Sequence, residues 1–308
     1  MRMYRYVVVS TVALALVAGA CGSSKKSSSP SSSTSTKTTL TIGSANFSES
    51  TIMAEAYAGA LEAKGYKVNR KYNLGAREVY YPAATGGNID LFPDYAATLL
   101  EYVDKGTGLA TADAKETVDK LNAQIGSAGL TALEASPAID ANAFAVTKAT
   151  ADKYHLTKLS DLAAVAGQLK LGAPAECAQR PYCALGLKSV YGITFKELLP
   201  FKFDSPEVKT ALKNGNVDVA ELGTTDGTVD QDGFVILQDD KHLQLADNLT
   251  PVIRTKALND EIKTTLNKVS AAMSTSELAA LDKRADVDKE DPETVAHSWL
   301  KSEGFVKS

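Results

Sequence analysis

Apolar positions between residues 38 and 308 follow two different periods. Short runs at 38–44, 67–73 and 88–93 read as strands, and the segments after them place apolar residues at helical spacing. The first helical stretch follows Thr51 and stops at Gly65. The next is expected at 76–87, and a third begins at residue 96. Three strand–helix units in succession predict a parallel sheet with helices on both faces.

The same order of elements restarts after residue 140, and the last fifty residues are nearly all helical. The expected strands are 142–148, 169–174, 217–222 and 233–238, and the expected helices include 205–215, 258–273, 276–285 and 292–305. The segment 249–254 then returns the chain to the first unit. We therefore predict an α/β protein with two lobes. Lobe I comprises 38–139 plus 251–308, and lobe II comprises 140–250.

The N-terminus has the layout of a secretory signal peptide over 1–20. Arginines precede an apolar run at 7–18, and small residues lead to Cys21. The run has about 12 residues, whereas a spanning helix needs roughly 20. Cys21 resembles the lipidated cysteine of bacterial lipoproteins, although Ala18 stands where such motifs favour Leu. The alternative is an ordinary signal. We expect export, a lipid anchor on the outer face of the cytoplasmic membrane, and a flexible tether at 21–37.

Composition excludes several classes of partner. Apolar residues make up 44% of the chain and charged residues 23%, and the net charge is −4. Neither nucleic acid nor an anionic membrane surface is indicated as a partner. Cys177 and Cys183 are six positions apart, which in an exported protein predicts a disulfide worth on the order of 2 kcal/mol. No metal site is expected, because zinc would need further ligands and the three histidines are scattered.

No motif for catalysis or for a cofactor is present. The chain lacks a P-loop, a nucleophile elbow and a zinc-protease signature. The segment 224–232 is rich in aspartate but lacks the spacing of a calcium loop, so a turn is the favoured interpretation. Three loops, 44–50, 92–95 and 221–227, follow strands where ligands bind in open α/β folds. We therefore expect a binding protein, not an enzyme, and no cofactor.

Five segments carry a resemblance that covers nearly all of 38–308. They are 43–50, 73–100, 153–163, 186–195 and 221–242. In order and spacing they resemble the solute-binding proteins of glycine betaine/choline/carnitine ABC importers, which take up osmoprotectants. The resemblance implies a type II-like periplasmic-binding fold, with a mixed, mainly parallel sheet in each lobe and a ligand cleft between lobes. It also implies a small-molecule ligand and delivery to an ABC permease and its ATPase. We expect a monomer.

The aromatic cage of that family is altered in this sequence. Tyr95 matches one cage tyrosine, but Asn142 stands at a second cage position. The third corresponds to Leu222 or Gly223, and the fourth lies near Asp247. Rings stabilise a desolvated quaternary ammonium by cation–π contacts. Glycine betaine should therefore bind weakly, and another polar or aromatic solute that stacks on Tyr95 is expected.

The expected ligand-binding residues lie at strand ends or in the family's cleft motifs. They are Asn46, Phe47, Ser48, Ser50, Arg77, Glu78, Tyr95, Asn142, Phe144, Arg180, Thr224, Thr225 and Asp226. Arg77 and Arg180 could bind a planar anion through two hydrogen bonds. The alternative for Arg180 is that it only pins the disulfide loop. For Tyr80, Tyr81 and Tyr182, packing or surface exposure is favoured over ligand contact.

A second function stays open at this point. A tethered sensor of the same fold could pass its ligand state to a receptor instead of a permease. A neighbouring permease gene would favour the importer, and a neighbouring receptor gene would favour the sensor. An enzyme is a distant third, because no nucleophile is paired with a base in the sequence.

Overall fold

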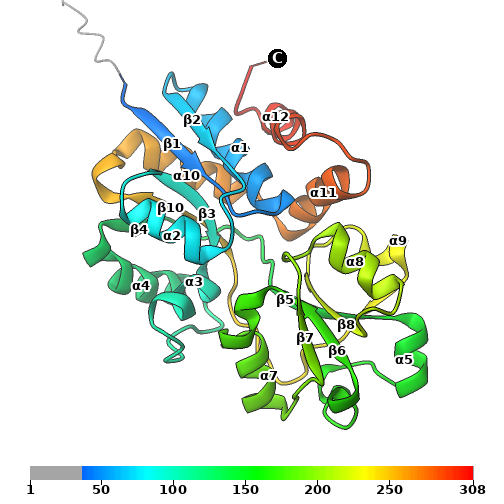
Figure 1. The fold of residues 1–308 in the computed structure, drawn as a ribbon. Coiled ribbons are helices and arrows are strands. Elements are labelled where there is room, and N and C mark those ends of the chain that lie inside the picture. Colours follow the sequence, from blue (N-terminus) through cyan, green and yellow to red (C-terminus); the bar gives the residue numbers. More distant parts are fainter. Residues whose placement is uncertain (1–36, 308) are drawn as a thin grey trace, which may run out of the picture. The chain divides into compact units, whose positions relative to one another are not determined.

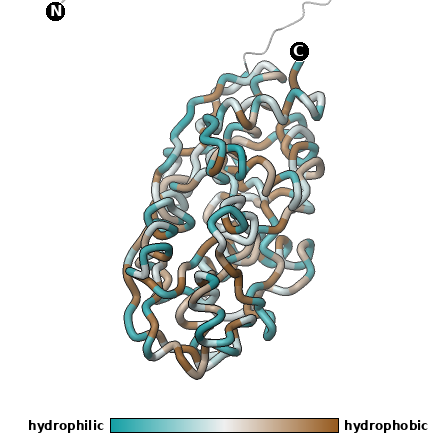
Figure 2. The backbone as a smooth tube through the Cα atoms, turned by 90° about the vertical axis from the view of Figure 1, so that its right-hand side faces the viewer, coloured by the Kyte–Doolittle hydropathy of each residue, from teal (hydrophilic) through white to brown (hydrophobic). Residues whose placement is uncertain are grey.

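The computed structural model describes residues 37–307, which contain two five-stranded sheets flanked by helices (Figure 1). The signal peptide, Cys21 and the tether up to residue 36 lie outside the described residues. Apolar and polar stretches alternate along the chain in both lobes (Figure 2). None of the helices within 37–307 combines the length and apolar character needed to cross a bilayer.

The first sheet has the strand order β2-β1-β3-β10-β4. Its strands are β1 (Thr39–Gly43), β2 (Lys67–Lys71), β3 (Leu91–Tyr95), β4 (Leu130–Ala132) and β10 (Leu249–Arg254). β1 pairs in parallel with β2 and β3, whereas β10 pairs antiparallel with β3 and β4. Four strands therefore point the same way, and only the strand that returns from the second lobe is reversed.

The second sheet repeats this plan with the order β7-β6-β8-β5-β9. Its strands are β5 (Asn142–Thr147), β6 (Lys170–Ala173), β7 (Glu197–Pro200), β8 (Val219–Gly223) and β9 (Phe234–Ile236). Here β5, the strand that enters from the first lobe, is the reversed one, since it pairs antiparallel with β8 and β9. The predicted two-lobed fold with mixed, mainly parallel sheets is confirmed.

Helices cover both sheets. They are α1 (Ser48–Glu62), α2 (Arg77–Thr85), α3 (Ala96–Val103), α4 (Ala114–Ile125), α5 (Lys148–Tyr154), α6 (Leu159–Leu162), α7 (Ala184–Tyr191), α8 (Pro206–Lys213), α9 (Val229–Asp232), α10 (Asp260–Ala272), α11 (Thr275–Asp286) and α12 (Pro292–Ser302), with 3-10 turns η1 (Gly126–Ala128), η2 (Ala166–Gln168), η3 (Ala175–Gln179) and η4 (Thr255–Ala257). α1 is buried along most of its length because α10, α11 and α12 pack around it. A Cβ on Gly59 would lie 2.6 Å from Leu300 Cδ1, so α1 and α12 approach closely there.

Pro93 does not end the third strand, as the sequence had suggested. It lies inside β3, directly opposite Pro251 of β10. Proline lacks the N–H that a sheet ladder uses. Pro251 O accepts a hydrogen bond from the Leu133 N–H over 2.9 Å, so the backbone polar groups of Pro251 point away from β3. Pro93 and Pro251 therefore form a non-hydrogen-bonded pair, where a missing N–H costs the ladder nothing, and β3 continues to Tyr95.

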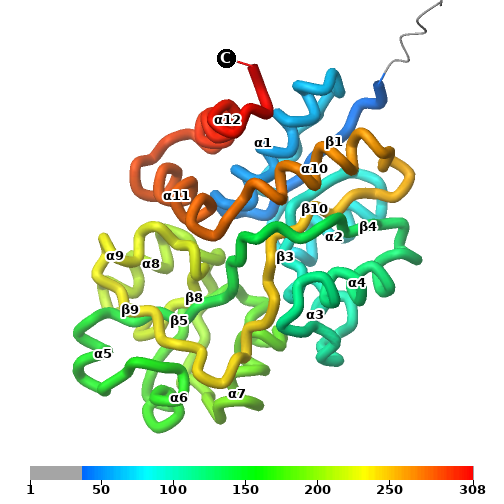
Figure 3. The backbone as a smooth tube through the Cα atoms, turned by 180° about the vertical axis from the view of Figure 1, so that it is seen from behind, coloured from blue at the N-terminus to red at the C-terminus, as the bar shows by residue number. Residues whose placement is uncertain are grey.

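Two segments cross between the lobes and run beside each other (Figure 3). Ile139 and Asn248 form an antiparallel bridge. The Asp140 N–H donates to Asp247 O over 3.2 Å, and the Leu249 N–H donates to Ala138 O over 3.1 Å. The predicted lobe boundaries fall near these crossings, although the one at 250/251 lies inside β10. The boundaries stay a prediction.

The lobes also touch away from the crossings. Gly227 of lobe II lies against Lys283 of α11, and a Cβ built on this glycine would be 2.6 Å from Lys283 Cα. A side chain at position 227 therefore does not fit without a shift of backbone.

Candidate ligand-binding site

A cavity of about 440 Å³ lies between the two lobes. The first lobe lines it with the loop after β1, the start of α2 and the junction of β3 with α3. The second lobe lines it with residues 174–182 around η3, the segment 200–203 after β7, and Glu221 of β8. A molecule in this cavity would therefore contact both lobes at once. The volume lies within the range of sites for small organic molecules.

Seven aromatic side chains line the cavity. They are Phe47, Tyr80, Tyr95, Tyr102, Tyr182, Phe201 and Phe203. The rings of Phe47 and Tyr95 are stacked with centroids 6.3 Å apart. Phe203 of lobe II meets Phe47 edge-on at 5.3 Å. The sequence predicts that three cage positions of the family are not aromatic in this chain; the cavity nevertheless has aromatic side chains at other positions.

Tyr95 is linked to the second lobe through Glu49. Its hydroxyl donates a hydrogen bond to Glu49 Oε1. Thr225 Oγ1 donates to the other oxygen of that carboxylate over 2.6 Å. Glu49 is only 4% exposed, so water does not compete strongly for these bonds. The position of the Tyr95 ring is therefore coupled to contact between the lobes.

Two more buried acids lie close to Glu49. Burial, and next the charge of Glu49, raise the pKa of Asp140 and of Asp282 well above the usual value of a carboxyl group. The three acids line a second, much smaller pocket with Ser48 and Thr225. Asp140 Oδ1 accepts hydrogen bonds from the Thr225 N–H and the Thr224 hydroxyl, each over 3.1 Å. This acidic group thus lies where the lobes meet.

The two arginines at the cavity are already paired with acids. Arg77 Nη2 lies 2.6 Å from Asp94 Oδ1 and also donates to Thr98 Oγ1. Arg180 Nη2 lies 2.7 Å from Glu78 Oε1, which joins the disulfide loop of lobe II to α2 of lobe I.

The Arg180 guanidinium also stands over the Tyr102 ring, 5.2 Å from its centroid. Arg180 therefore both lines the cavity and bridges the lobes at its rim. The salt bridge to Glu78 agrees with the alternative that Arg180 pins the disulfide loop, and its contact with a ligand stays a prediction.

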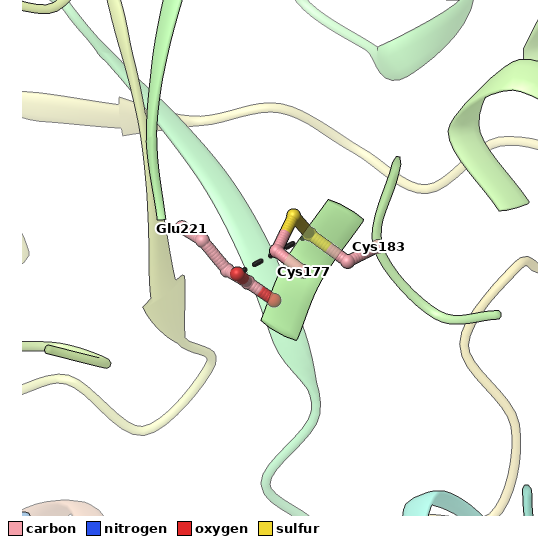
Figure 4. Close-up of side chains that lie close together, drawn as sticks. All are labelled: Cys177, Cys183 and Glu221. Atoms are coloured by element: carbon pink, nitrogen blue, oxygen red, sulfur yellow. Dashed lines mark hydrogen bonds between the residues drawn. A yellow bond between two sulfur atoms is a disulfide. The ribbon is translucent and has the colours of Figure 1, made fainter. Parts of the chain in front are cut away.

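A disulfide joins Cys177 and Cys183, and Glu221 lies beside it (Figure 4). Cys183 Sγ is 3.3 Å from Glu221 Oε2. The three side chains are close enough to suggest metal ligands. Metal binding would need a thiolate, and the two sulfurs are bonded to each other. The group is therefore a buried acid against a disulfide.

Six of the residues expected from the sequence line the larger cavity. They are Asn46, Phe47, Arg77, Tyr95, Asn142 and Arg180. Ser48 and Thr225 line the small acidic pocket together with Phe47. Asn142 uses its amide to donate to Tyr182 O over 3.3 Å. These eight residues come from both lobes, as expected for a cleft, and their contact with a ligand remains a proposal.

Five other expected residues lie away from both pockets. Ser50 Oγ accepts from the Ala45 N–H over 2.9 Å and so shapes the loop before α1. Glu78 pairs with Arg180 instead of facing the cavity. Phe144 lies two residues further along β5 than Asn142, on the same face but deeper, and is 1% exposed.

Thr224 and Asp226 complete this group. Thr224 bonds to Asp140 and to the Ala141 N–H. Asp226 Oδ1 lies 3.0 Å from Lys209 Nζ and accepts from Thr228. Both side chains fix the loop after β8 and leave Thr225 to reach Glu49.

None of the four acids that line the cavity was expected from the sequence. The cavity is also lined by Glu101, Asp140, Glu176 and Glu221. Glu221 could have been found from the sequence, because it is a charged residue inside a strand, VAELG, whose other residues are apolar. The structure shows that all five residues of this strand are buried. Phe201 and Phe203 were harder to find, because the only indication in the sequence is that aromatic residues alternate after β7.

Comparison with known proteins decides the family. The model of the family described as the substrate-binding domain of ABC-type glycine betaine transport systems matches residues 38–302. The chain belongs to this family. The resemblance seen in the sequence is thereby confirmed, and with it the general role of a substrate-binding protein of an ABC importer.

Individual relatives agree with this assignment. The carnitine transport binding protein OpuCC of Listeria monocytogenes is 28% identical over 281 residues, covering 87% of this chain and 88% of OpuCC. The glycine betaine-binding protein YehZ of Escherichia coli (strain K12) is 27% identical over 279 residues, covering 86% and 91%. A crystal structure described as a glycine betaine/carnitine/choline ABC transporter aligns with a TM-score of 0.66 at 28% identity, covering 86% of this chain and 99% of that one. These relatives are transport binding proteins, not enzymes.

Proposed function

We propose that this protein captures a small polar solute outside the cytoplasmic membrane, encloses it between its lobes and presents it to an ABC permease driven by an ATPase. The observation that carries the proposal is the 440 Å³ cavity lined by both lobes. A ligand that contacts both walls favours the closed arrangement by its differential affinity for that state. The permease can then distinguish loaded from empty protein.

The lining supports a solute with positive charge and polar groups. Aromatic rings offer cation–π contacts to a positive head, and the cavity carries four carboxyl groups. Glycine betaine, carnitine and choline, the compounds named for the relatives, are the first candidates. Because three family cage positions are not aromatic here, other amines and aromatic cations belong in the same screen.

A thermal-shift screen tests the proposal directly. Purified protein is heated with betaines, choline, carnitine, amino acids, polyols and phenolic compounds. A ligand at 100 times its Kd stabilises the native state by about 2.7 kcal/mol, which raises the unfolding midpoint measurably. Uptake of each hit is then compared between cells with and without the gene. A hit whose uptake does not depend on the protein would contradict the transport role.

We propose in addition that Cys21 carries a lipid that holds the protein at the membrane, with 21–37 as the tether. The small residues before Cys21 and the polar composition after it support this. Replacement of Cys21 by serine should release the protein from the membrane fraction. Persistence of the Cys21→Ser protein in washed membranes would refute the anchor.

A further inference from the structure

Glu221 presents a carboxyl group to the cavity without a strong partner. It lies on β8, is 3% exposed and lines the cavity wall. Its one side-chain contact of hydrogen-bond length among residues 37–307 is Cys183 Sγ at 3.3 Å. That sulfur belongs to a disulfide and has no proton to donate. An ionised Glu221 therefore receives no hydrogen bond within this part of the chain.

The other charged groups of the cavity are better satisfied. Arg77 is bound by Asp94, and Arg180 by Glu78. Asp140 accepts two hydrogen bonds, from Thr224 and Thr225.

Two further acids and one lysine complete the lining. Glu101 accepts a hydrogen bond from the Tyr182 hydroxyl over 3.4 Å. Glu176 is half-buried and Lys202 is exposed, so water can solvate them. Glu221 is thus the deeply buried acid of the cavity that lacks a donor.

The electrostatic surroundings of Glu221 agree with this geometry. Burial, and next the charge of Glu176, raise its pKa to about 8, while Arg180 acts in the opposite direction. At neutral pH the empty protein therefore holds Glu221 mainly as the neutral acid. A bound cation would favour the carboxylate, and the proton would leave to solvent.

We propose that Glu221 selects the ligand of this cavity: its carboxylate accepts a hydrogen bond from a positively charged N–H group, so the preferred solute is an amine cation that keeps at least one N–H. The inference rests on the proposed function and narrows its substrate class. Aromatic rings attract methylated and unmethylated cations alike. A fully methylated ammonium cannot donate, and it would leave the buried carboxylate unmatched.

Two series of compounds that differ only in N-methylation test this. The first is glycine, N-methylglycine, N,N-dimethylglycine and glycine betaine; the second is N,N-dimethylethanolamine and choline. Calorimetry with the purified protein should find N,N-dimethylglycine or N,N-dimethylethanolamine bound at least ~10-fold more tightly than its trimethylated partner. Glu221→Gln should lose most of that ratio. The control Glu207→Gln, which changes an exposed acid of α8 in the same lobe, should keep it.

A second measurement separates the proposal from a merely structural role. Titrations at pH 7 in two buffers of different ionisation enthalpy count protons released on binding. The wild type should release protons with an N–H cation, and Glu221→Gln should not. Thermal unfolding of both variants checks that they are folded.

A wild type that prefers the trimethylated compounds overturns the proposal, as does an unchanged ratio in Glu221→Gln. If no compound of either series binds, the substrate class is wrong. The proposed function is decided apart from this by uptake: dependence of choline or betaine uptake on the protein would uphold transport even where the inference on Glu221 fails.

Discussion

Thr225 Oγ1 of the second lobe donates a hydrogen bond to Glu49 Oε2 of the first, over 2.6 Å. The same carboxylate accepts from the Tyr95 hydroxyl. One buried acid therefore connects a ring of the cavity wall to the contact between lobes. We therefore predict that ligand contact with Tyr95 and closure of the cleft depend on each other.

Thr225→Val should weaken this connection without changing the volume of the side chain much. Loss of one hydrogen bond, with Glu49 left partly unsatisfied, costs on the order of 1 kcal/mol, or about five-fold in affinity for whichever solute binds. Calorimetry measures the affinity, and small-angle scattering should show a larger radius of gyration for the ligand-bound variant. Thr210→Val, at an exposed position of α8, is the matched control. Equal affinity in Thr225→Val and Thr210→Val would contradict the role of this bond.

Tyr95→Ala should reduce ligand affinity by at least ~1 kcal/mol, because it removes a ring that lines the cavity and stacks on Phe47. Tyr95→Phe keeps the ring and loses only the hydroxyl bond to Glu49. The expected order of affinity is wild type, then Tyr95→Phe, then Tyr95→Ala. An affinity for Tyr95→Ala equal to that of the wild type would remove this residue from the site.

The Cys177–Cys183 disulfide should stabilise the protein and hold Arg180 at the rim of the cavity. Its short loop corresponds to about 2 kcal/mol in the free energy of unfolding. Chemical denaturation of the Cys177→Ser/Cys183→Ser double variant measures this difference. Mass spectrometry of the non-reduced wild type should show both thiols missing. Two free thiols in that experiment would show that Cys177 and Cys183 are not joined.

Asp247 should make stability fall as the pH rises. Burial raises its pKa from 3.8 to about 7, although the Thr98 N–H bond and Arg77 oppose the shift. The folded state thus binds a proton more tightly than the unfolded state. The resulting stability is fully present below about pH 4 and is lost as the pH rises to 7.

Asp247→Asn retains an oxygen for the Thr98 N–H and does not ionise. It should match the wild type at pH 4 and exceed its unfolding free energy by at least ~1 kcal/mol at pH 8. Urea titrations at both values measure this, with the exposed Asp230→Asn as control. A constant difference between Asp247→Asn and wild type at the two pH values would count against the assignment.

The sequence carried enough information for the fold, because long periodic segments report which face is buried. The helix 48–62 and the strand 142–147 were expected within a few residues of their observed bounds. β4, with three residues, and β7, which is largely uncovered, were missed. A short edge strand is defined by its neighbours, and its own residues give little periodic signal.

The site was harder to predict, because a cavity between lobes depends on where loops from distant segments meet. Phe203 contacts Phe47 although the two residues are 156 positions apart in the sequence, and no local sequence pattern predicts such a contact. Phe144 shows the converse. It was expected to line the cleft, but its side chain is only 1% exposed, and its depth below the cleft could not be predicted from the sequence.

Gly227 lets the backbones of the two lobes come into close contact. A Cβ built on Gly227 would lie 2.6 Å from Lys283 Cα, so no side chain fits between the two lobes at this contact. Gly227→Ala should therefore keep the two lobes further apart, by about the size of a methyl group. Contact of both cavity walls with a bound solute would thus depend on the absence of a Cβ atom at position 227.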